Sequence, residues 1–200
     1  VDSDKSLFKQ YSTQFLRGMS ERMRDSCSSS QLNEFLQERF TFFREAIRRS
    51  GMVRVRKHKI SQVSLTEKNN SRCVIVEIVS PDAPFIVVTV EALMRQLDLL
   101  ILCKLHPIIG VDLTEGKEVE KVFLPQQDLE KYDHLYLEVE TEAENATLKH
   151  IETMIAGHML AIQLVRNHHQ YMLTNLESMI ELIETITAVS SDTKNEWSKL

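Results

Sequence analysis

The sequence predicts an α+β fold in which helices cover one face of an antiparallel sheet, and three observations support it. Residues 73–79 form an apolar run interrupted only by Glu77, which is typical of a buried strand. Residues 84–107 indicate a short helix that leads directly into a second apolar strand. Residues 134–140 alternate apolar and polar side chains and predict a third strand. The order strand, helix, strand, strand is that of small α+β sandwiches.

Composition is that of an ordinary globular chain. The 200 residues are 42% hydrophobic and 26% charged with a net charge of −5, enough for one domain or two small ones. The first sixty residues are basic and the remainder is acidic. Because no aromatic residues interleave the basic cluster, it indicates a solvated or domain-docking face, and no nucleic-acid partner is predicted. The cluster comprises Arg48, Arg49, Arg54, Arg56, Lys57 and Lys59.

Cysteine usage and hydropathy point to a cytoplasmic protein. Cys27, Cys73 and Cys103 are odd in number and lack CxxC spacing, which favours reduced thiols. No apolar run approaches the length of a membrane span, and nothing resembles a signal peptide, so no membrane partner is expected. Because the chain begins with Val1, we expect a fragment or a processed form.

Two amphipathic helices are predicted at the start of the chain. Apolar residues recur at spacings of 3 and 4 over residues 7–23 and again over residues 31–50. Ser30 is the expected N-cap of the second helix and Gly51 its expected stop. Residues 1–51 are therefore interpreted as an N-terminal helical arm.

The strands are expected to form a four-stranded sheet of the ferredoxin-like or ACT-like kind, completed by residues 52–57. Core-facing side chains are predicted at 74, 76 and 78, at 99, 101, 103 and 105, and at 135, 137 and 139. Residues 110–122 indicate a hairpin, and residues 125–133 a polar connection. The opposite face is expected to be charged and open to solvent. It would present Arg54, Arg56, Glu77, Lys104, His106, Tyr136 and Glu138.

A long helix is predicted after residue 144, because apolar residues keep a spacing near 3.5 for more than forty residues. We assign residues 52–167 to the α+β domain and residues 168–200 to a C-terminal helical extension. The distal part, residues 171–189, is expected to pack on the N-terminal helices, on a neighbouring domain or on another copy.

No catalytic or metal-binding residues are predicted. His158, His168 and His169 lack the i, i+4 spacing of a helical metal site, and no glycine-rich phosphate loop exists. Cys103 is expected in the core, where a thiol is inert, and no histidine is placed beside Cys73. Glu77 and Glu138 are interpreted as residues that form cross-strand ion pairs with Lys104 or Arg54.

One turn remains as a candidate ligand site. A helix is predicted to begin after residues 80–84, and its unpaired N–H groups suit the carboxylate of a small ligand. The candidate residues are Asp82, Ala83 and Phe85, together with His106 at the end of the following strand. For His106, a hydrogen bond to a neighbouring backbone group is the alternative interpretation.

Residues 75–111 resemble the N-terminal region of the large bacterial NAD-specific glutamate dehydrogenases. The resemblance lies in V-E-I-V at residues 76–79, in Pro84, Phe85 and Val87 at the helix start, and in H-P at residues 106–107. Residues 134–140, the helix after them and the segment around residues 40–56 are similar to the corresponding parts of the family. Val88 and Thr89 replace an Asp-Ser of the family pattern, which weakens any inference about a ligand at this turn.

The resemblance implies an ACT-like domain upstream of the catalytic core, with a non-catalytic role in regulation or assembly. The parent enzyme would convert L-glutamate to 2-oxoglutarate and ammonia with NAD, while this segment would hold no cofactor. The implied partners are downstream domains of the same chain, an amino-acid effector and further copies in a homo-oligomer. The alternative is a structural self-association module without a small-molecule ligand.

Overall fold

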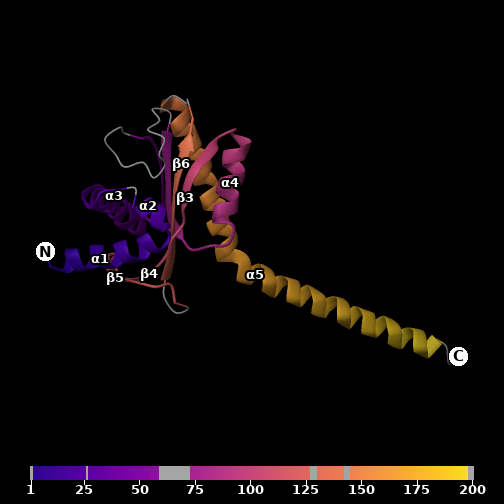
Figure 1. The fold of residues 1–200 in the computed structure, drawn as a ribbon. Helices are drawn as coiled ribbons and strands as arrows, with labels where there is room; N and C mark the ends of the chain where they lie inside the picture. The colour runs from indigo at the N-terminus through magenta and orange to yellow at the C-terminus, as the bar shows by residue number, and fades with distance from the viewer. Residues whose placement is uncertain (1, 26, 59–72, 127–129, 142–144, 198–200) are drawn as a thin grey trace. The chain divides into compact units, whose positions relative to one another are not determined.

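One antiparallel sheet of six strands organises the chain (Figure 1). The computed structural model describes residues 2–25, 27–58, 73–126, 130–141 and 145–197. The strands are β1 (Met52–Lys57), β2 (Cys73–Pro81), β3 (Leu100–Leu105), β4 (Ile108–Leu113), β5 (Val119–Phe123) and β6 (Glu130–Glu140). The predicted α+β class is confirmed, but the four-strand prediction is wrong. The hairpin of β4 and β5 belongs to the sheet, because β4 pairs with the start of β6, where we expected a polar connection.

Strand β6 is the centre of the sheet. One edge pairs with β2 from Cys73↔Glu140 to Pro81↔Tyr132, so β3 and β4 share the other edge. Pro107 separates β3 from β4, and its carbonyl accepts the His134 N–H at 3.0 Å. Because proline has no N–H to donate, it interrupts the ladder while its carbonyl still contacts β6.

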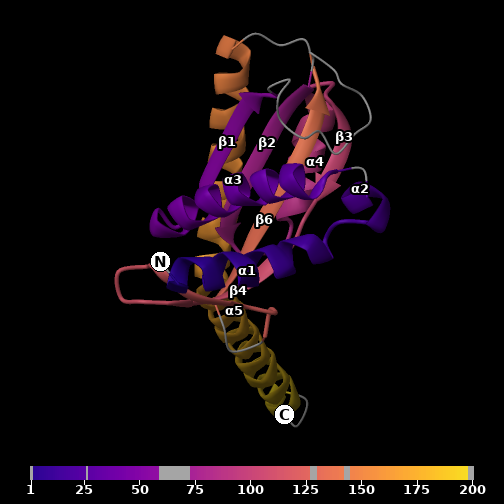
Figure 2. The same ribbon diagram turned by 60° about the vertical axis from the view of Figure 1, so that its left-hand side comes forward.

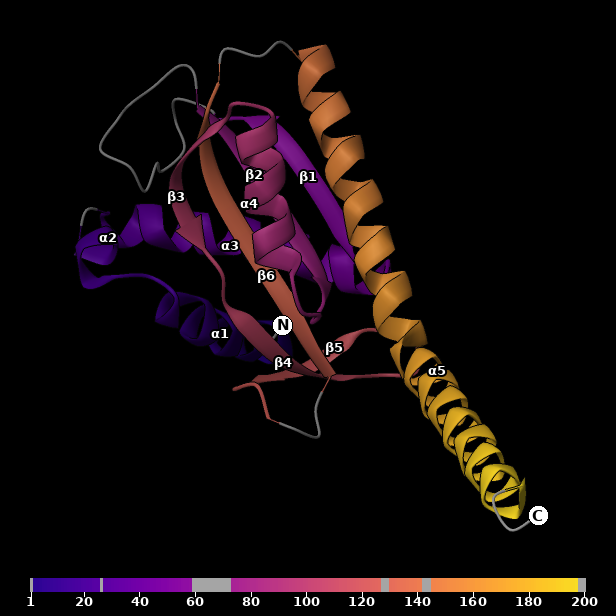
Figure 3. The same cartoon turned by 90° about the vertical axis from the view of Figure 1, so that its right-hand side faces the viewer.

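Helices cover both faces of the sheet (Figures 2 and 3). Helices α1 (Asp2–Arg17) and α3 (Ser29–Arg48), joined through the short α2 (Glu21–Asp25), pack on one face, and α4 (Ile86–Gln96) and the first half of α5 (Asn145–Trp197) pack on the other. The expectation of a solvent-exposed face is therefore wrong. Glu77, Tyr136 and Glu138, which were assigned to it, are each 0% exposed because α1 and α3 lie over them.

A β-bulge moves part of β3 to the unexpected face. The pairing of β3 with β6 shifts register between Ile101 and Cys103. Ile101 packs with the core beneath α4 and α5, whereas Cys103 and Leu105 pack with the core beneath α1 and α3. An extra residue in one strand reverses the side on which the following side chains point, so a strict alternation could not hold.

Local capping explains the helix ends. Ser28, not the predicted Ser30, caps α3, and a capping box with Gln31 satisfies two amide groups. At the other end Gly51 has φ of +126° and donates its N–H to the Ala46 carbonyl at 2.8 Å, as a helix stop requires. The helix predicted over residues 7–23 is instead interrupted after Arg17, at Gly18.

The chain separates into two compact units, Val1–Ile162 and Gln163–Leu200, and α5 contributes to both. Side chains Leu148, Ile151, Ile155 and Met159 of its first half are buried in the first unit. The finer division into residues 1–51, 52–167 and 168–200 stays a prediction. Among the described residues, no helix combines the length and the apolar character needed to cross a membrane.

Candidate functional site

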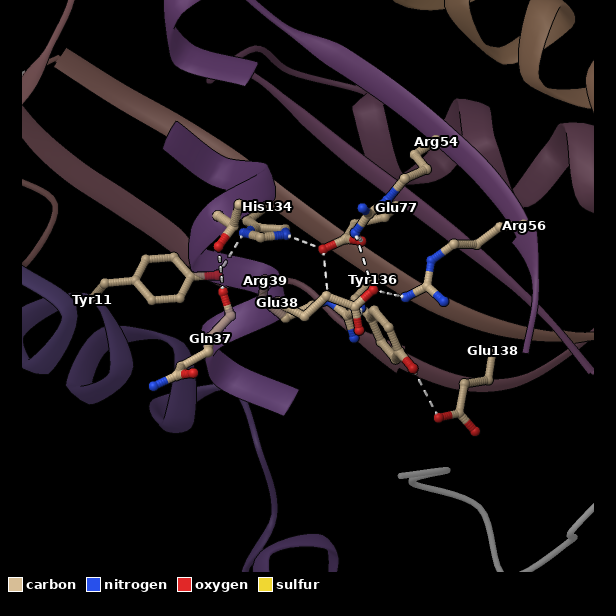
Figure 4. A network of polar contacts seen from close by, with 11 residues as sticks. Tyr11, Gln37, Glu38, Arg39, Arg54, Arg56, Glu77, His134, Tyr136 and Glu138 are labelled. Atoms are coloured by element: carbon tan, nitrogen blue, oxygen red, sulfur yellow. Dashed lines mark hydrogen bonds and ion pairs between the residues drawn. The ribbon is translucent and has the colours of Figure 1, made fainter. Parts of the chain in front are cut away.

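A buried polar network lies between the sheet and helices α1 and α3 (Figure 4). Its core consists of Tyr11 from α1, Arg39 from α3, Arg54 from β1, Glu77 from β2 and His134 from β6. All except Arg54 are at most 1% exposed, in the midst of an aromatic core. Ionisable groups at this depth are rare unless they are paired, so each contact matters.

The Glu77 carboxylate is the centre of this network. Its Oε1 lies 2.9 Å from Arg39 Nε and 3.0 Å from His134 Nε2, and its Oε2 accepts from Arg54 Nη2 at 2.5 Å. Burial by itself raises the pKa of Glu77, but Arg39, His134 and Arg54 outweigh burial and hold that pKa at about 2. The carboxylate is therefore ionised throughout the physiological pH range.

His134 is neutral and has a defined tautomer. Burial lowers its pKa more than the neighbouring Glu77 raises it, so the imidazole carries no charge at neutral pH. Since ionised Glu77 can only accept, Nε2 bears the proton and donates to it. Nδ1 then accepts from the Tyr11 hydroxyl at 3.0 Å. The ring stacks on Phe43 with centroids 5.8 Å apart and an interplanar angle of 6°.

Arg39 joins α3 to the sheet. Its guanidinium lies 4.8 Å from the Phe35 ring centroid and 4.9 Å from that of Tyr136. Nε and Nη2 contact Glu77 and Glu38 at 2.9 and 2.8 Å as ion pairs, without hydrogen-bond alignment of the N–H groups. Burial lowers the pKa of Arg39, but the nearby carboxylates outweigh this effect and raise it, so the group stays charged.

The outer edge of the network is partly exposed at Glu38 and Arg56 and buried at Tyr136 and Glu138. Glu38 pairs with Arg56 and lies 3.8 Å from Arg54, while the Tyr136 hydroxyl donates to Glu138 at 3.0 Å. Arginine and glutamate charges are thus balanced locally. Such an arrangement orients α1 and α3 on the sheet, but it presents no reactive group to a substrate.

Two of the four predicted ligand residues, Ala83 and His106, meet at Asp133 on β6. Asp133 is 1% exposed, its Oδ2 accepts the Ala83 N–H at 3.3 Å, and its Oδ1 lies 2.5 Å from His106 Nε2. The Asp82 N–H donates to the Lys131 carbonyl at 2.8 Å. We call Asp82, Ala83, His106 and Asp133 the Asp133 cluster. It connects the turn before α4, the end of β3 and the start of β6.

Phe85 lies at the N-cap of α4 in an unusual conformation. Its φ is +73°, in the left-handed region that bulky residues rarely adopt, and its side chain is 73% exposed. It offers no side-chain acceptor to the first turn of α4. The turn therefore combines a strained backbone, an exposed aromatic ring and a helix start without a capping side chain.

Sequence reasoning predicted one contact of the buried network, the cross-strand ion pair of Glu77 with Arg54, but it found neither the rest of the network nor Asp133. A signal for the network existed, because Arg39 lies on the apolar stripe of α3, between Phe35 and Phe43, and Glu77 interrupts an apolar strand. Opposite charges on two otherwise apolar surfaces indicate a buried pair. Asp133 carried no comparable signal, because it lies in the stretch that was predicted to be a polar connection, residues 125–133.

Other candidates for chemistry are weak. Burial raises the pKa of Cys73 to about 11 and that of Cys103 to about 12, so neither thiol is a ready nucleophile. Within the described ranges, no group of three or more His, Cys, Asp or Glu side chains could hold a metal ion.

A shallow hollow of about 560 Å³ lies along α3. Its arginines are ion-paired: Arg44 with Asp4, Arg48 with Glu118 and Arg49 with Glu45.

Comparison with known proteins identifies one family. The family model described as glutamate dehydrogenase, ACT1 domain, matches residues 11–155. The match begins at Tyr11 of the buried network and ends at Ile155 of α5, so it includes the whole sheet and the Asp133 cluster. Searches of curated proteins and of solved structures return no match. The resemblance to glutamate dehydrogenases expected from residues 75–111 is thereby confirmed.

Proposed function

The chain belongs to the glutamate dehydrogenase ACT1-domain family, and we propose that it is a non-catalytic regulatory domain of an NAD-dependent, cytoplasmic glutamate dehydrogenase. In this proposal the domain binds no NAD. Other parts of the parent enzyme bind NAD and convert L-glutamate to 2-oxoglutarate and ammonia. The observation that supports the proposal is the match of the family model to residues 11–155.

The proposed effector is an amino acid bound at the start of α4. Its carboxylate would accept from first-turn N–H groups, where the helix dipole favours negative charge. The Phe85 ring, 73% exposed, would cover the apolar part of the ligand. The Asp133 cluster supports the proposal because it ties this turn to two strands of the sheet.

Strand β6 offers a route from this turn to the other face. Asp133 contacts the turn before α4, and its neighbour His134 contacts Glu77 and Tyr11 beneath α1 and α3. A ligand that favours one position of Asp133 would therefore bias the packing of those helices. Differential affinity of the effector for two such arrangements is what regulation requires.

Isothermal titration calorimetry of the 200-residue chain with a panel of amino acids tests the proposal. We expect saturable heat from at least one amino acid, and loss of that heat in Phe85→Gly. Glycine tolerates a positive φ, so this variant removes the ring without destabilising the turn. Its unfolding midpoint should equal or exceed that of the unchanged chain.

Asp98→Gly is the matched control. Asp98 lies just beyond the other end of α4 with φ of +56°, so the same backbone relief occurs away from the proposed ligand. Its binding heat should be unchanged. Silence across the whole panel would favour the second candidate, a structural self-association module. Turnover of glutamate with NAD by this chain alone would contradict its non-catalytic role.

A further inference from the structure

His134 of β6 can become charged only if water reaches its ring. The side chain is 0% exposed, and four aromatic rings from α1 and α3 surround it: Tyr11, Phe15, Phe42 and Phe43. Its Nε2 already bears the proton that it donates to the β2 carboxylate, so a second proton must bind at Nδ1. Access of water to Nδ1 therefore decides the charge of this imidazole.

Helix α1 covers this nitrogen. The Tyr11 hydroxyl donates to His134 Nδ1 at 3.0 Å, and the Phe15 ring centroid lies 5.1 Å from that of His134. Figure 4 shows Tyr11 and Glu77 on opposite sides of the imidazole. Because Glu77 lies on β2 and pairs with α3, separation of α1 from the sheet would expose Nδ1 and leave the Glu77 contact in place.

Charged groups from the other packed elements do not overcome burial. Glu77 of β2 favours a charged imidazole, whereas Arg39 of α3 and Arg54 of β1 disfavour it, and burial has the largest effect and lowers the pKa of His134. Tyr11 of α1 keeps its proton, because burial raises the pKa of its hydroxyl. The closed arrangement therefore holds a neutral ring.

Different contacts hold α3 and α1 to the sheet. Arg39 of α3 forms an ion pair with the buried carboxylate of β2 at 2.9 Å. Among the described residues, the polar contacts of α1 with strands are neutral: Tyr11 with His134, and Gln10 Oε1 with the Val122 N–H at 3.0 Å. A protonated Nδ1 can no longer accept from Tyr11. A second proton on the ring thus weakens the contact of α1 and leaves the ion pair of α3 intact.

We propose that α1 is a proton-controlled cover of the sheet, which separates from it when the His134 ring takes up a second proton, while α3 stays in place. The inference goes beyond the proposed regulatory function and does not rest on it. The open form binds one proton more than the closed form, so the ratio of open to closed forms should rise by up to about tenfold for each pH unit below about 6.5.

Hydrogen–deuterium exchange of the 200-residue chain, measured by mass spectrometry at pH 7.5, 6.5 and 5.5, tests the proposal. After correction for the intrinsic exchange rate at each pH, the protection of residues 7–17 should fall by about five- to tenfold from pH 7.5 to 5.5. The protection of residues 35–47 in α3 should stay unchanged. This difference distinguishes separation of α1 from unfolding of the whole domain.

His134→Gln and its control, His150→Gln, show whether this histidine is responsible. Glutamine keeps a donor and an acceptor but does not titrate, so residues 7–17 of His134→Gln should be equally protected at all three pH values. His150 is exposed on α5. His150→Gln should therefore keep the pH dependence of the unchanged chain.

NMR titration of the His134 ring in the unchanged chain requires no variant. We expect the folded-state pKa of His134 to lie below 6.5. A value at or above 6.5 would contradict the proposal, as would unchanged protection of α1, equal loss of protection in α1 and α3, or a full pH dependence in His134→Gln. These measurements involve no amino-acid effector, so their failure is distinguishable from failure of the regulatory proposal.

Discussion

Substituting Arg39 by methionine provides the sharpest test of the buried network. Methionine keeps an unbranched apolar stem between Phe35 and Tyr136 but removes the guanidinium. Of its close partners among the described residues, Glu77, 0% exposed, then retains Arg54 and neutral His134. A buried carboxylate that loses its main counter-charge pays the desolvation cost without full compensation.

The size of the effect can be estimated in two ways. A folded-state pKa near 2 for Glu77, against an ordinary value of 4.5, corresponds to roughly 3 kcal/mol of stability at neutral pH. Removing one partner of a buried ion pair typically costs about 3–5 kcal/mol. Both figures are large beside the roughly 5–15 kcal/mol that stabilises a typical domain.

Urea unfolding followed by circular dichroism is the assay. The unfolding free energy of a small domain falls by roughly 2 kcal/mol per molar urea. Arg39→Met should therefore lower the urea concentration at the unfolding midpoint by about 2 M. Adding Glu77→Gln should recover much of the loss, since the uncompensated charge is gone while the side chain still accepts from Arg54. Destabilisation by less than about 1 kcal/mol, or strict additivity of the two substitutions, would refute the importance of this pair.

Arg49→Met is the matched control for that experiment. Arg49 follows the same helix and pairs with Glu45 at 2.8 Å, but its side chain is 65% exposed. Solvent screens such a pair, so the unfolding midpoint should hardly move.

Two further predictions concern acid stability and the docking of α5. The free energy of unfolding should fall as pH drops from 6.5 towards the lowered pKa of His134, because the histidine of the unfolded chain is protonated first. It should fall again between about pH 5 and 2, where Glu77 is protonated in the unfolded chain before it is protonated in the folded one. Glu77→Gln should remove the second loss from the pH dependence of the urea midpoint. Ile155→Ala, at a fully buried position of α5, should lower the free energy of unfolding by about 2–5 kcal/mol. Leu164→Ala, at a 51% exposed position, should leave the thermal unfolding midpoint of the first unit unchanged. Equal effects of these two substitutions would contradict the observed extent of the core.

Much of the fold could be read from the sequence because its signals are local. The helical spacing of apolar residues predicted α3 and the long α5, and alternation or continuous apolar character predicted β1, β2, β3 and much of β6. Gly51 was identified as a helix stop because the need for a positive φ is a property of one residue. Family resemblance across residues 75–111 was also visible, since it depends on the order of residues alone.

Tertiary structure alone decided which surfaces are buried and which polar groups meet. Alternation shows that β2 has two faces, but it cannot tell that α1 and α3 cover the second one, so Glu77 was assigned to solvent. The bulge in β3 arises from pairing with β6, which no local pattern encodes. Asp133 gathers Ala83 and His106 from segments far apart in the chain. Contacts of this kind depend on register and on the second helical layer, because burial of a polar group is set by everything that packs around it.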